Sequence, residues 1–100
     1  MNTPKTMLSR SIYKVPQGKL LKISLDYDEN KNTIHHIRIT GDFFAYPEEA
    51  IEILENELKN SLLEQENLLK KIHSIITEHD IQFIGIDAEG LTRAILMCKQ

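Results

Sequence analysis

The hydrophobic pattern of this chain changes its period once, near the middle, and that change constrains the fold more than any other feature. Between residues 19 and 27 apolar and polar side chains alternate, as in a β-strand with one buried face. After the segment GDFFAYP (41–47) the apolar residues recur three or four positions apart, as on one face of a helix. Strands followed by helices in a chain of 100 residues predict one α+β domain.

The first half of the chain predicts a small antiparallel sheet of about three strands. The segment SIYKV (11–15) favours a short strand, and a turn follows in which Gly18 is expected to take a positive φ. The alternating segment 19–27 and the return segment TIHHIRITG (33–41) are expected to be the next two strands. Ile34 lies out of phase with the apolar residues after it, which predicts a β-bulge or a frayed strand start.

The second half predicts about three helices that cover one face of this sheet. Pro47 suits the first turn of the first helix, and Asp87 is expected to be the N-cap of the last. Gly90 lies in the first turn of that last helix, where glycine costs about 1 kcal/mol relative to alanine. The segment IQFIGID (81–87) is expected to be a connector or a small strand. The expected apolar stripes are Ala50, Ile51, Leu54 and Leu58; Leu68, Leu69, Ile72, Ile75 and Ile76; and Leu91, Ala94, Ile95 and Cys98.

Length and composition limit the domain organisation and the class of protein. Residues 1–8 are expected to form a loose arm before a single domain over residues 9–100. The net charge of −3 argues against general nucleic-acid binding, and no apolar run approaches the roughly 20 residues of a membrane span. The single Cys98 excludes an internal disulfide and suits a reducing compartment, so a cytoplasmic location is expected.

The charges are unevenly placed along the chain. No Asp or Glu precedes Asp26, whereas residues 48–66 hold seven glutamates against Lys59 alone. This asymmetry predicts a basic rim and an acidic face. An organelle transit peptide is another interpretation of the acid-free start, but the strand-like alternation argues against it.

Familiar catalytic and metal-binding motifs are absent from the sequence. The segment KVPQGK (14–19) is not a P-loop, because it has one glycine, no Ser or Thr after the lysine, and a strand behind it. His73 and His79 are six residues apart, which does not place two metal ligands on one helical face. No serine has a nucleophile-elbow motif, and Cys98 falls on an apolar stripe. The sequence therefore predicts no catalytic residue and no metal site.

Two short segments remain as candidates for contact with a partner. Lys14 and Lys19 flank a tight turn, where two ammonium groups either face a phosphate or an acidic partner or are simply solvated at the strand ends. Asp42 is expected to accept backbone N–H groups in its turn. One of Phe43 and Phe44 is expected to fill the core, and the other, if exposed, is a natural interface anchor.

These segments, in this order, resemble the C-terminal accessory domain of lipoate–protein ligases. The resemblance runs from about Tyr13 to Leu96 and includes KVPQGKLLKI, IRITGDFF, PEEAIEILENEL and IGIDAEGLTRAI. In this family the domain is either fused to the catalytic domain or exists as a separate small subunit. The matching positions are Lys14, Pro16, Gly18, Lys19, Gly41, Asp42, Phe43, Phe44, Gly85 and Leu91.

The resemblance implies an accessory role with no catalytic residue in this chain. The expected partner is a large catalytic subunit that activates lipoate with ATP and magnesium to lipoyl-adenylate, and the accessory chain is required for that step. The lipoyl group then passes to a lysine of the lipoyl domains of 2-oxoacid dehydrogenases or of the glycine-cleavage H protein. Lys14, Gly18, Lys19, Asp42, Phe43 and Phe44 are the expected contact or phosphate-facing residues.

Two alternative functions remain open from the sequence. A stand-alone carrier of sulfur or iron–sulfur clusters would need an exposed, reactive cysteine, and Cys98 on an apolar stripe argues against it. A plain adaptor unrelated to lipoate would lack any interaction with a catalytic ligase subunit.

Overall fold

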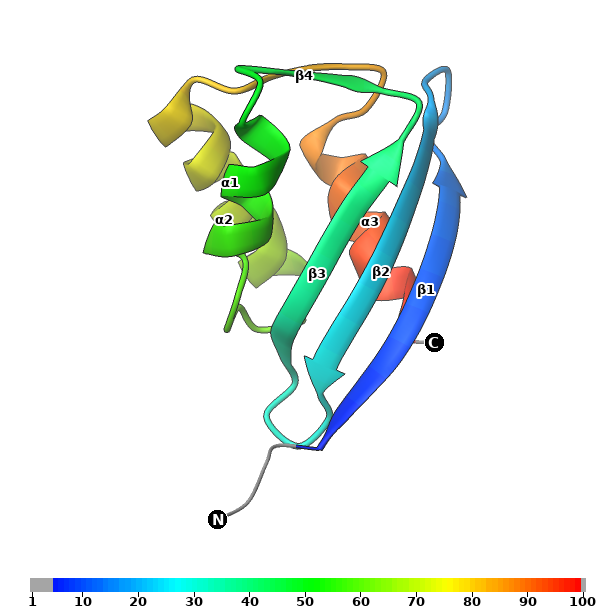
Figure 1. Cartoon of the computed structure of the whole chain (residues 1–100), viewed down its shortest axis with the longest axis vertical. Helices are drawn as coiled ribbons and strands as arrows, with labels where there is room; N and C mark the ends of the chain where they lie inside the picture. Colours follow the sequence, from blue (N-terminus) through cyan, green and yellow to red (C-terminus); the bar gives the residue numbers. More distant parts are fainter. Residues whose placement is uncertain (1–4, 100) are drawn as a thin grey trace.

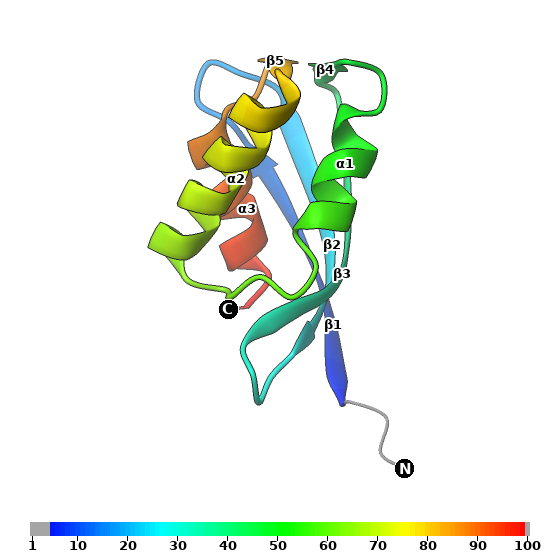
Figure 2. The same ribbon diagram turned by 90° about the vertical axis from the view of Figure 1, so that its left-hand side faces the viewer.

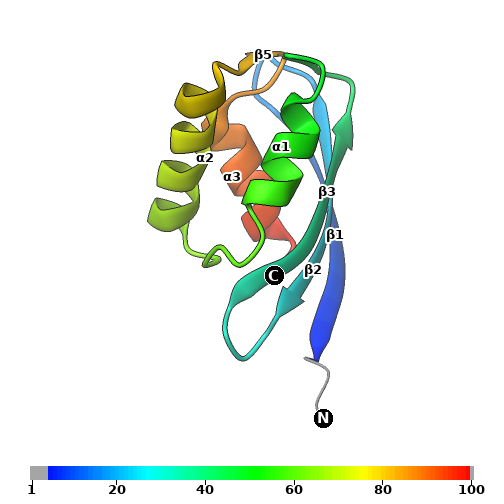
Figure 3. The same cartoon turned by 60° about the vertical axis from the view of Figure 1, so that its left-hand side comes forward.

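A three-stranded antiparallel sheet forms one layer of the molecule, and the helices form the other. In the computed structural model, which describes residues 5–99, the sheet consists of β1 (Thr6–Lys14), β2 (Leu20–Asp28) and β3 (Thr33–Gly41) in the order β1-β2-β3. All the helices lie on one face of this sheet, and the other face is left open (Figures 2 and 3). The predicted α+β architecture is therefore confirmed.

The alternation seen in the sequence corresponds to the two faces of β2 and β3. Leu21, Ile23 and Leu25 of β2 are buried against the helices, whereas Lys22 points to the open face and is exposed. The register of β2 against β3 shifts between Asp26 and Tyr27, and this bulge allows Ile34 to be fully buried. The bulge predicted at Ile34 is confirmed.

Strand β1 starts earlier than the sequence suggested. Thr6, Met7 and Leu8 pair with Asp28, Tyr27 and Asp26 of β2. The expectation of a loose arm over residues 1–8 is thus wrong for these three residues, and its first four residues lie outside the described part of the chain. The strand was missed because Met7 and Leu8 are exposed, so no buried alternation marks it.

The helices are arranged in two tiers over the sheet. Helix α3 (Ala88–Met97) packs on β1 and β2, and α1 (Ala50–Glu57) packs on β3. Helix α2 (Gln65–His79) packs on α1 and α3, on the side away from the sheet (Figures 1 and 2). The helix-side core is made of Leu54, Leu58, Leu68, Ile72, Ile75, Leu91, Ala94 and Ile95.

Two local predictions about helix starts had different outcomes. Asp87 is the N-cap of α3, and its Oδ1 accepts a hydrogen bond from the backbone N–H of Gly90 at 2.7 Å. Pro47 is not in the first turn of α1, because that helix begins at Ala50, whose N–H donates to the Pro47 carbonyl at 2.9 Å. Pro47 and the two glutamates after it form a turn that leads into the helix.

A second, two-stranded sheet closes one end of the molecule. Strand β4 (Phe44–Tyr46) pairs antiparallel with β5 (Gln82–Ile84), which joins α2 to α3. The β1–β2 turn lies beside this sheet at the same end (Figure 2). The small strand expected around residues 81–87 is confirmed as β5.

Candidate functional site

The candidate contact residues predicted from the sequence all lie at one end of the molecule. This region, called the turn end below, consists of the β1–β2 turn (14–19), the corner Gly41–Phe44, and the β4–β5 sheet with Gly85. Figure 1 shows the β1–β2 turn, the end of β3 and β4 together at the top of the molecule.

The β1–β2 turn is tight, but its left-handed residue is not the glycine. The N–H of Val15 donates to the Lys19 carbonyl at 3.1 Å, and the N–H of Gly18 donates to the Val15 carbonyl at 2.8 Å. Gln17 has the positive φ of 57°, so the prediction that Gly18 takes it is wrong. A turn pattern alone does not say which of two neighbouring residues adopts the left-handed conformation.

Gly18 is required by a close backbone approach instead. The N–H of Lys19 donates to the Gly85 carbonyl at 2.7 Å, which brings the turn onto the β5–α3 connection. A Cβ on Gly18 would lie 2.5 Å from the Gly85 oxygen. Gly85 has φ of 98°, and a Cβ there would lie 2.5 Å from Cγ of Lys19. The two glycines therefore let the turn and the connection touch, and they fix where the stem of Lys19 lies.

The corner at Gly41–Phe44 continues this packing. The N–H of Asp42 donates to the Leu20 carbonyl at 3.1 Å, and a Cβ on Gly41, whose φ is 152°, would lie 2.2 Å from that same oxygen. The Asp42 side chain is exposed, and the hydrogen bond at this corner comes from its backbone rather than from its carboxylate. Phe43 packs against the core, whereas Phe44 is 65% exposed.

Three exposed apolar side chains form what we call the apolar patch on the β4–β5 sheet: Phe44, Tyr46 and Ile84. Phe44 is directly opposite Ile84 in the ladder, and Tyr46 lies two residues further along the same face. Their exposures are 65%, 54% and 56%. Ala45 and Phe83, on the other face, pack against the core. The expectation that one of Phe43 and Phe44 is buried while the other anchors an exposed surface agrees with this arrangement.

The two lysines of the turn are both exposed. The Nζ of Lys14 lies 3.4 Å from the Val15 carbonyl, and in the described part of the chain neither lysine forms an ion pair. The structure thus places two ammonium groups and three large apolar side chains at one end of the molecule. This combination suits a protein partner that also presents negative charge.

A cleft of about 540 Å³ lies beside the turn, between β1 and α3. Its lining includes Tyr13, Val15, Asp87 and Arg93, and the Arg93 guanidinium lies 6.0 Å from the centre of the Tyr13 ring. That geometry is a cation–π contact. Sequence reasoning did not identify this cleft, because its walls combine β1 and its turn with α2 and α3, which are distant in the sequence.

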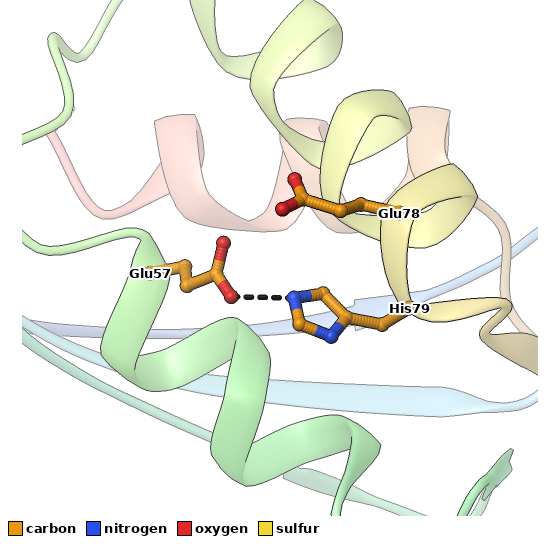
Figure 4. A group of neighbouring side chains, drawn as sticks. All are labelled: Glu57, Glu78 and His79. Carbon is orange, nitrogen blue, oxygen red and sulfur yellow. Dashed lines mark hydrogen bonds and ion pairs between the residues drawn. The ribbon is translucent and has the colours of Figure 1, made fainter.

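The clustered titratable groups are a structural contact between α1 and α2. Glu57, Glu78 and His79 place their ligand atoms within 4.8 Å of one another, and Glu57 Oε2 is 2.6 Å from His79 Nε2 (Figure 4). Glu78 is exposed on the surface of α2. A closed structural zinc site needs four ligands, and this group offers three. The Glu57–His79 contact accounts for the proximity of these two side chains.

Cys98 is buried beneath the sheet rather than presented to solvent. It is 2% exposed, its Sγ lies 3.7 Å from the Ala94 carbonyl, and Ser11 Oγ donates to that same carbonyl at 2.6 Å. Burial raises the pKa of the Cys98 thiol above its ordinary value of 9.0, against a smaller lowering by the hydrogen bond with Ser11. The thiol is therefore poorly nucleophilic at neutral pH.

Two residues of the turn end were not identified from the sequence. Tyr46 and Ile84 complete the apolar patch, but a three-residue strand has too few positions to show which side chains face solvent.

None of the helices described by the structure is long and apolar enough to cross a lipid bilayer.

Comparison with known proteins identifies the family. The family described as bacterial lipoate protein ligase C-terminus matches residues 14–95. Lipoate-protein ligase A subunit 2 from Thermoplasma acidophilum is 33% identical over 98 residues, which cover 95% of each protein. The solved structures of an archaeal lipoylation system from the same organism, a bipartite lipoate protein ligase and its E2 lipoyl domain, include a similar chain. It has a TM-score of 0.77 and 28% identity, over 91% of this chain and 97% of that one. The resemblance inferred from the sequence is confirmed, and the chain belongs to the lipoate protein ligase C-terminal family.

Proposed function

We propose that this chain is the small, non-catalytic subunit of a two-part lipoate–protein ligase, and that the catalytic subunit needs it to convert lipoate into lipoyl-adenylate. The observation that carries this proposal is the turn end, where an exposed apolar patch lies close to two exposed lysines. The similarity over 95% of both chains to a protein named subunit 2 of such a ligase supports the same assignment.

The apolar patch is proposed to be the anchor that docks on the catalytic subunit. Phe44, Tyr46 and Ile84 together form an exposed apolar surface. Contact with a partner would remove this surface from water, which is energetically favourable. Aromatic side chains in the centre of an interface commonly carry much of the binding free energy. The glycines Gly18 and Gly85 support the role, because they allow the turn that carries the lysines to pack directly on the β5–α3 connection beside the patch.

Lys14 and Lys19 are proposed to face the phosphates of ATP at the mouth of the catalytic site. In adenylation a lipoate carboxylate oxygen attacks the α-phosphorus, the bond from that phosphorus to the bridging oxygen breaks, and pyrophosphate leaves with the electron pair. Negative charge therefore grows on the leaving group, and a fixed ammonium group nearby stabilises it. The rigid backbone contact at Lys19 N–H, 2.7 Å from the Gly85 carbonyl, fixes the start of one such side chain.

Magnesium does not fit the residues of the turn end. Mg²⁺ prefers several oxygen ligands in octahedral geometry, and this end offers one carboxylate, Asp42, beside two cations. We therefore assign the ion to the catalytic subunit and the ATP phosphates. The lipoyl acceptors, the lipoyl domains of 2-oxoacid dehydrogenases and the glycine-cleavage H protein, are proposed to meet the assembled enzyme rather than this chain alone.

The first test measures lipoate-dependent pyrophosphate release by the catalytic subunit from the organism that encodes this chain, with and without this chain. We expect release only when both chains are present. Equal release by the catalytic subunit alone would overturn the accessory role and favour an adaptor without a link to adenylation.

The second test examines the lysines. The double variant Lys14→Ala/Lys19→Ala is expected to slow pyrophosphate release by about tenfold or more, because charge stabilisation of a leaving group is lost. Its matched control is Lys70→Ala/Lys71→Ala, which removes two exposed lysines from α2, outside the turn end. Equal rates for the two double variants would show that Lys14 and Lys19 do not act on the phosphates.

The carrier alternative is tested by alkylation of the native chain at pH 7. Sulfur or cluster transfer needs an accessible thiolate, whereas Cys98 is buried and protonated. We expect native Cys98 to resist iodoacetamide and to react once the chain is unfolded in urea. Rapid labelling of the native chain would favour the carrier.

A further inference from the structure

The two edges of the three-stranded sheet are treated very differently by the rest of the chain. On the β3 edge, the N–H of Ile39 donates to Glu55 Oε2 at 2.8 Å, and the N–H of Ile34 donates to the Ser61 carbonyl at 3.0 Å. On the β1 edge, no segment among residues 5–99 pairs with the outer side of the strand. β1 therefore presents a free edge, which lies at the outside of the sheet in Figure 1.

The hydrogen-bond pattern shows which backbone groups face outward on β1. The Leu20 carbonyl accepts from Asp42 on the β3 side, so the even-numbered residues of β2 bond toward β3. The odd-numbered residues of β2 consequently bond toward β1, and the Val15 N–H to Lys19 contact continues that ladder. In β1 it is then Leu8, Arg10 and Ile12 whose N–H and C=O groups point away from the sheet.

This edge lacks most of the features that natural sheets use to prevent pairing. The nine residues of β1 keep an unbroken register with β2, and the strand contains neither a proline nor a bulge. Leu8 and Ile12 are 64% and 62% exposed on the open face of the sheet. A long edge strand of this kind is a template for another strand.

Charge favours an acidic partner over a second copy of this chain. Arg10 lies in register with Ser24, and Ser24 with Arg38, so two guanidinium groups lie in one row across the open face. Two β1 strands overlapping over their full length would pair about Arg10 and place two guanidinium groups directly opposite each other. Shifted pairings shorten the ladder.

We propose that the free edge of β1 binds an extended segment of the catalytic subunit by strand addition. The added segment carries an acidic side chain beside Arg10 and apolar side chains beside Leu8 and Ile12. Every second residue of the segment is therefore apolar, acidic and apolar in turn. This surface is separate from the apolar patch of the turn end. The inference rests on the proposed function for the identity of the partner.

The primary test is residue-resolved amide hydrogen exchange of the isolated chain and of its complex with the catalytic subunit. In the isolated chain the N–H groups of Leu8, Arg10 and Ile12 face solvent and are expected to exchange quickly. In the complex their exchange is expected to slow by about 100-fold or more, because each outward N–H gains a partner. The neighbouring amides of Ser9 and Ser11, already bonded toward β2, serve as the internal control.

A pair of variants separates the backbone from the side chain. Ile12→Pro removes an outward N–H, which an edge strand tolerates when that group faces solvent. Ile12→Thr removes apolar surface but keeps the N–H. We expect the proline variant to keep its thermal unfolding midpoint near that of the threonine variant and to bind the catalytic subunit about tenfold more weakly than it.

The outcomes distinguish this inference from the proposed function. If pyrophosphate release requires this chain while the three amides stay unprotected in the complex, strand addition is overturned and the accessory role stands. Protection that appears in the isolated chain and rises with its concentration would instead assign the edge to a second copy. Failure of the two subunits to form a complex would overturn both proposals.

Discussion

The two faces of the three-stranded sheet are made by the same strands but have opposite chemistry. The inner face places Leu21, Ile23 and Leu25 of β2 beneath the helices, where α3 packs on this strand, and each is at most 2% exposed. The outer face places Lys22 and Arg38 toward solvent with no helix over them (Figure 3). Stability therefore depends on one face, and the other is available for interaction at little cost to the fold.

This division explains how so small a chain can serve as a subunit. Burying one face of the sheet under two tiers of helices supplies the core, so we expect the exposed outer face, the free edge of β1 and the apolar patch to contribute little to stability. Substitutions on each of these surfaces can therefore separate their contributions.

Leu25→Ala on the inner face is expected to lower the free energy of unfolding by about 2–5 kcal/mol, because it leaves a cavity beneath the helices. Lys22→Ala on the outer face is expected to change it by less than about 0.5 kcal/mol. Urea unfolding followed by circular dichroism measures both. Similar losses for the two variants would mean that the outer face also contributes to the stability of the fold.

Gly85→Ala at the turn end is expected to lower the free energy of unfolding by about 1–3 kcal/mol, because the residue has φ of 98° and touches Lys19. The new Cβ would also displace the stem of Lys19, so we expect the rate of pyrophosphate release to fall. Gln17→Gly is the control in the same turn, since glycine accepts the φ of 57° found there. Normal release by Gly85→Ala would argue against a need for a rigid turn.

Glu55→Ala on the covered edge of β3 is expected to cost about 1–3 kcal/mol, because it leaves the N–H of Ile39 without its partner. Glu57→Ala, which removes the contact to the partly exposed His79, is expected to cost less than about 1 kcal/mol. Thermal unfolding of the two variants gives the comparison. If Glu57→Ala is the more damaging, the α1–α2 contact outweighs the edge contact.

The smallest expected effect is a pH dependence from Cys98. The folded chain holds the pKa of this thiol above 9.0, so below that pH the thiol is protonated in both states and no stability is lost. As the pH rises past 9.0 the unfolded chain loses the proton first, and the free energy of unfolding falls. A Cys98→Ala variant should show a shallower decline between pH 8 and pH 10.5 in urea unfolding. Identical declines would assign the effect to other groups.

Local rules predicted much of the fold because they act on neighbouring residues. The alternation in β2, the bulge at Ile34 and the cap at Asp87 each depend on a few adjacent positions. The start of β1 at Thr6 was missed, because its side chains there are exposed and leave no pattern of burial.

The candidate site was predicted less completely, because it depends on segments distant in sequence. Gly18 was expected to serve its own turn, yet its role comes from the carbonyl of Gly85, 67 positions later. Ile84 joins Phe44 only through pairing of β4 with β5. Such contacts are set by the tertiary fold, which no local pattern contains.

Contacts between distant segments also explain why a glycine, a poor helix former, occupies position 90. This glycine lies in the first turn of α3, and a Cβ there would lie 3.1 Å from Cγ2 of Val15 and 2.9 Å from Oδ1 of the capping Asp87. The first turn of the helix thus packs directly against the Val15 side chain of the β1–β2 turn. A displacement of the turn would therefore be passed to the first turn of α3 through this contact.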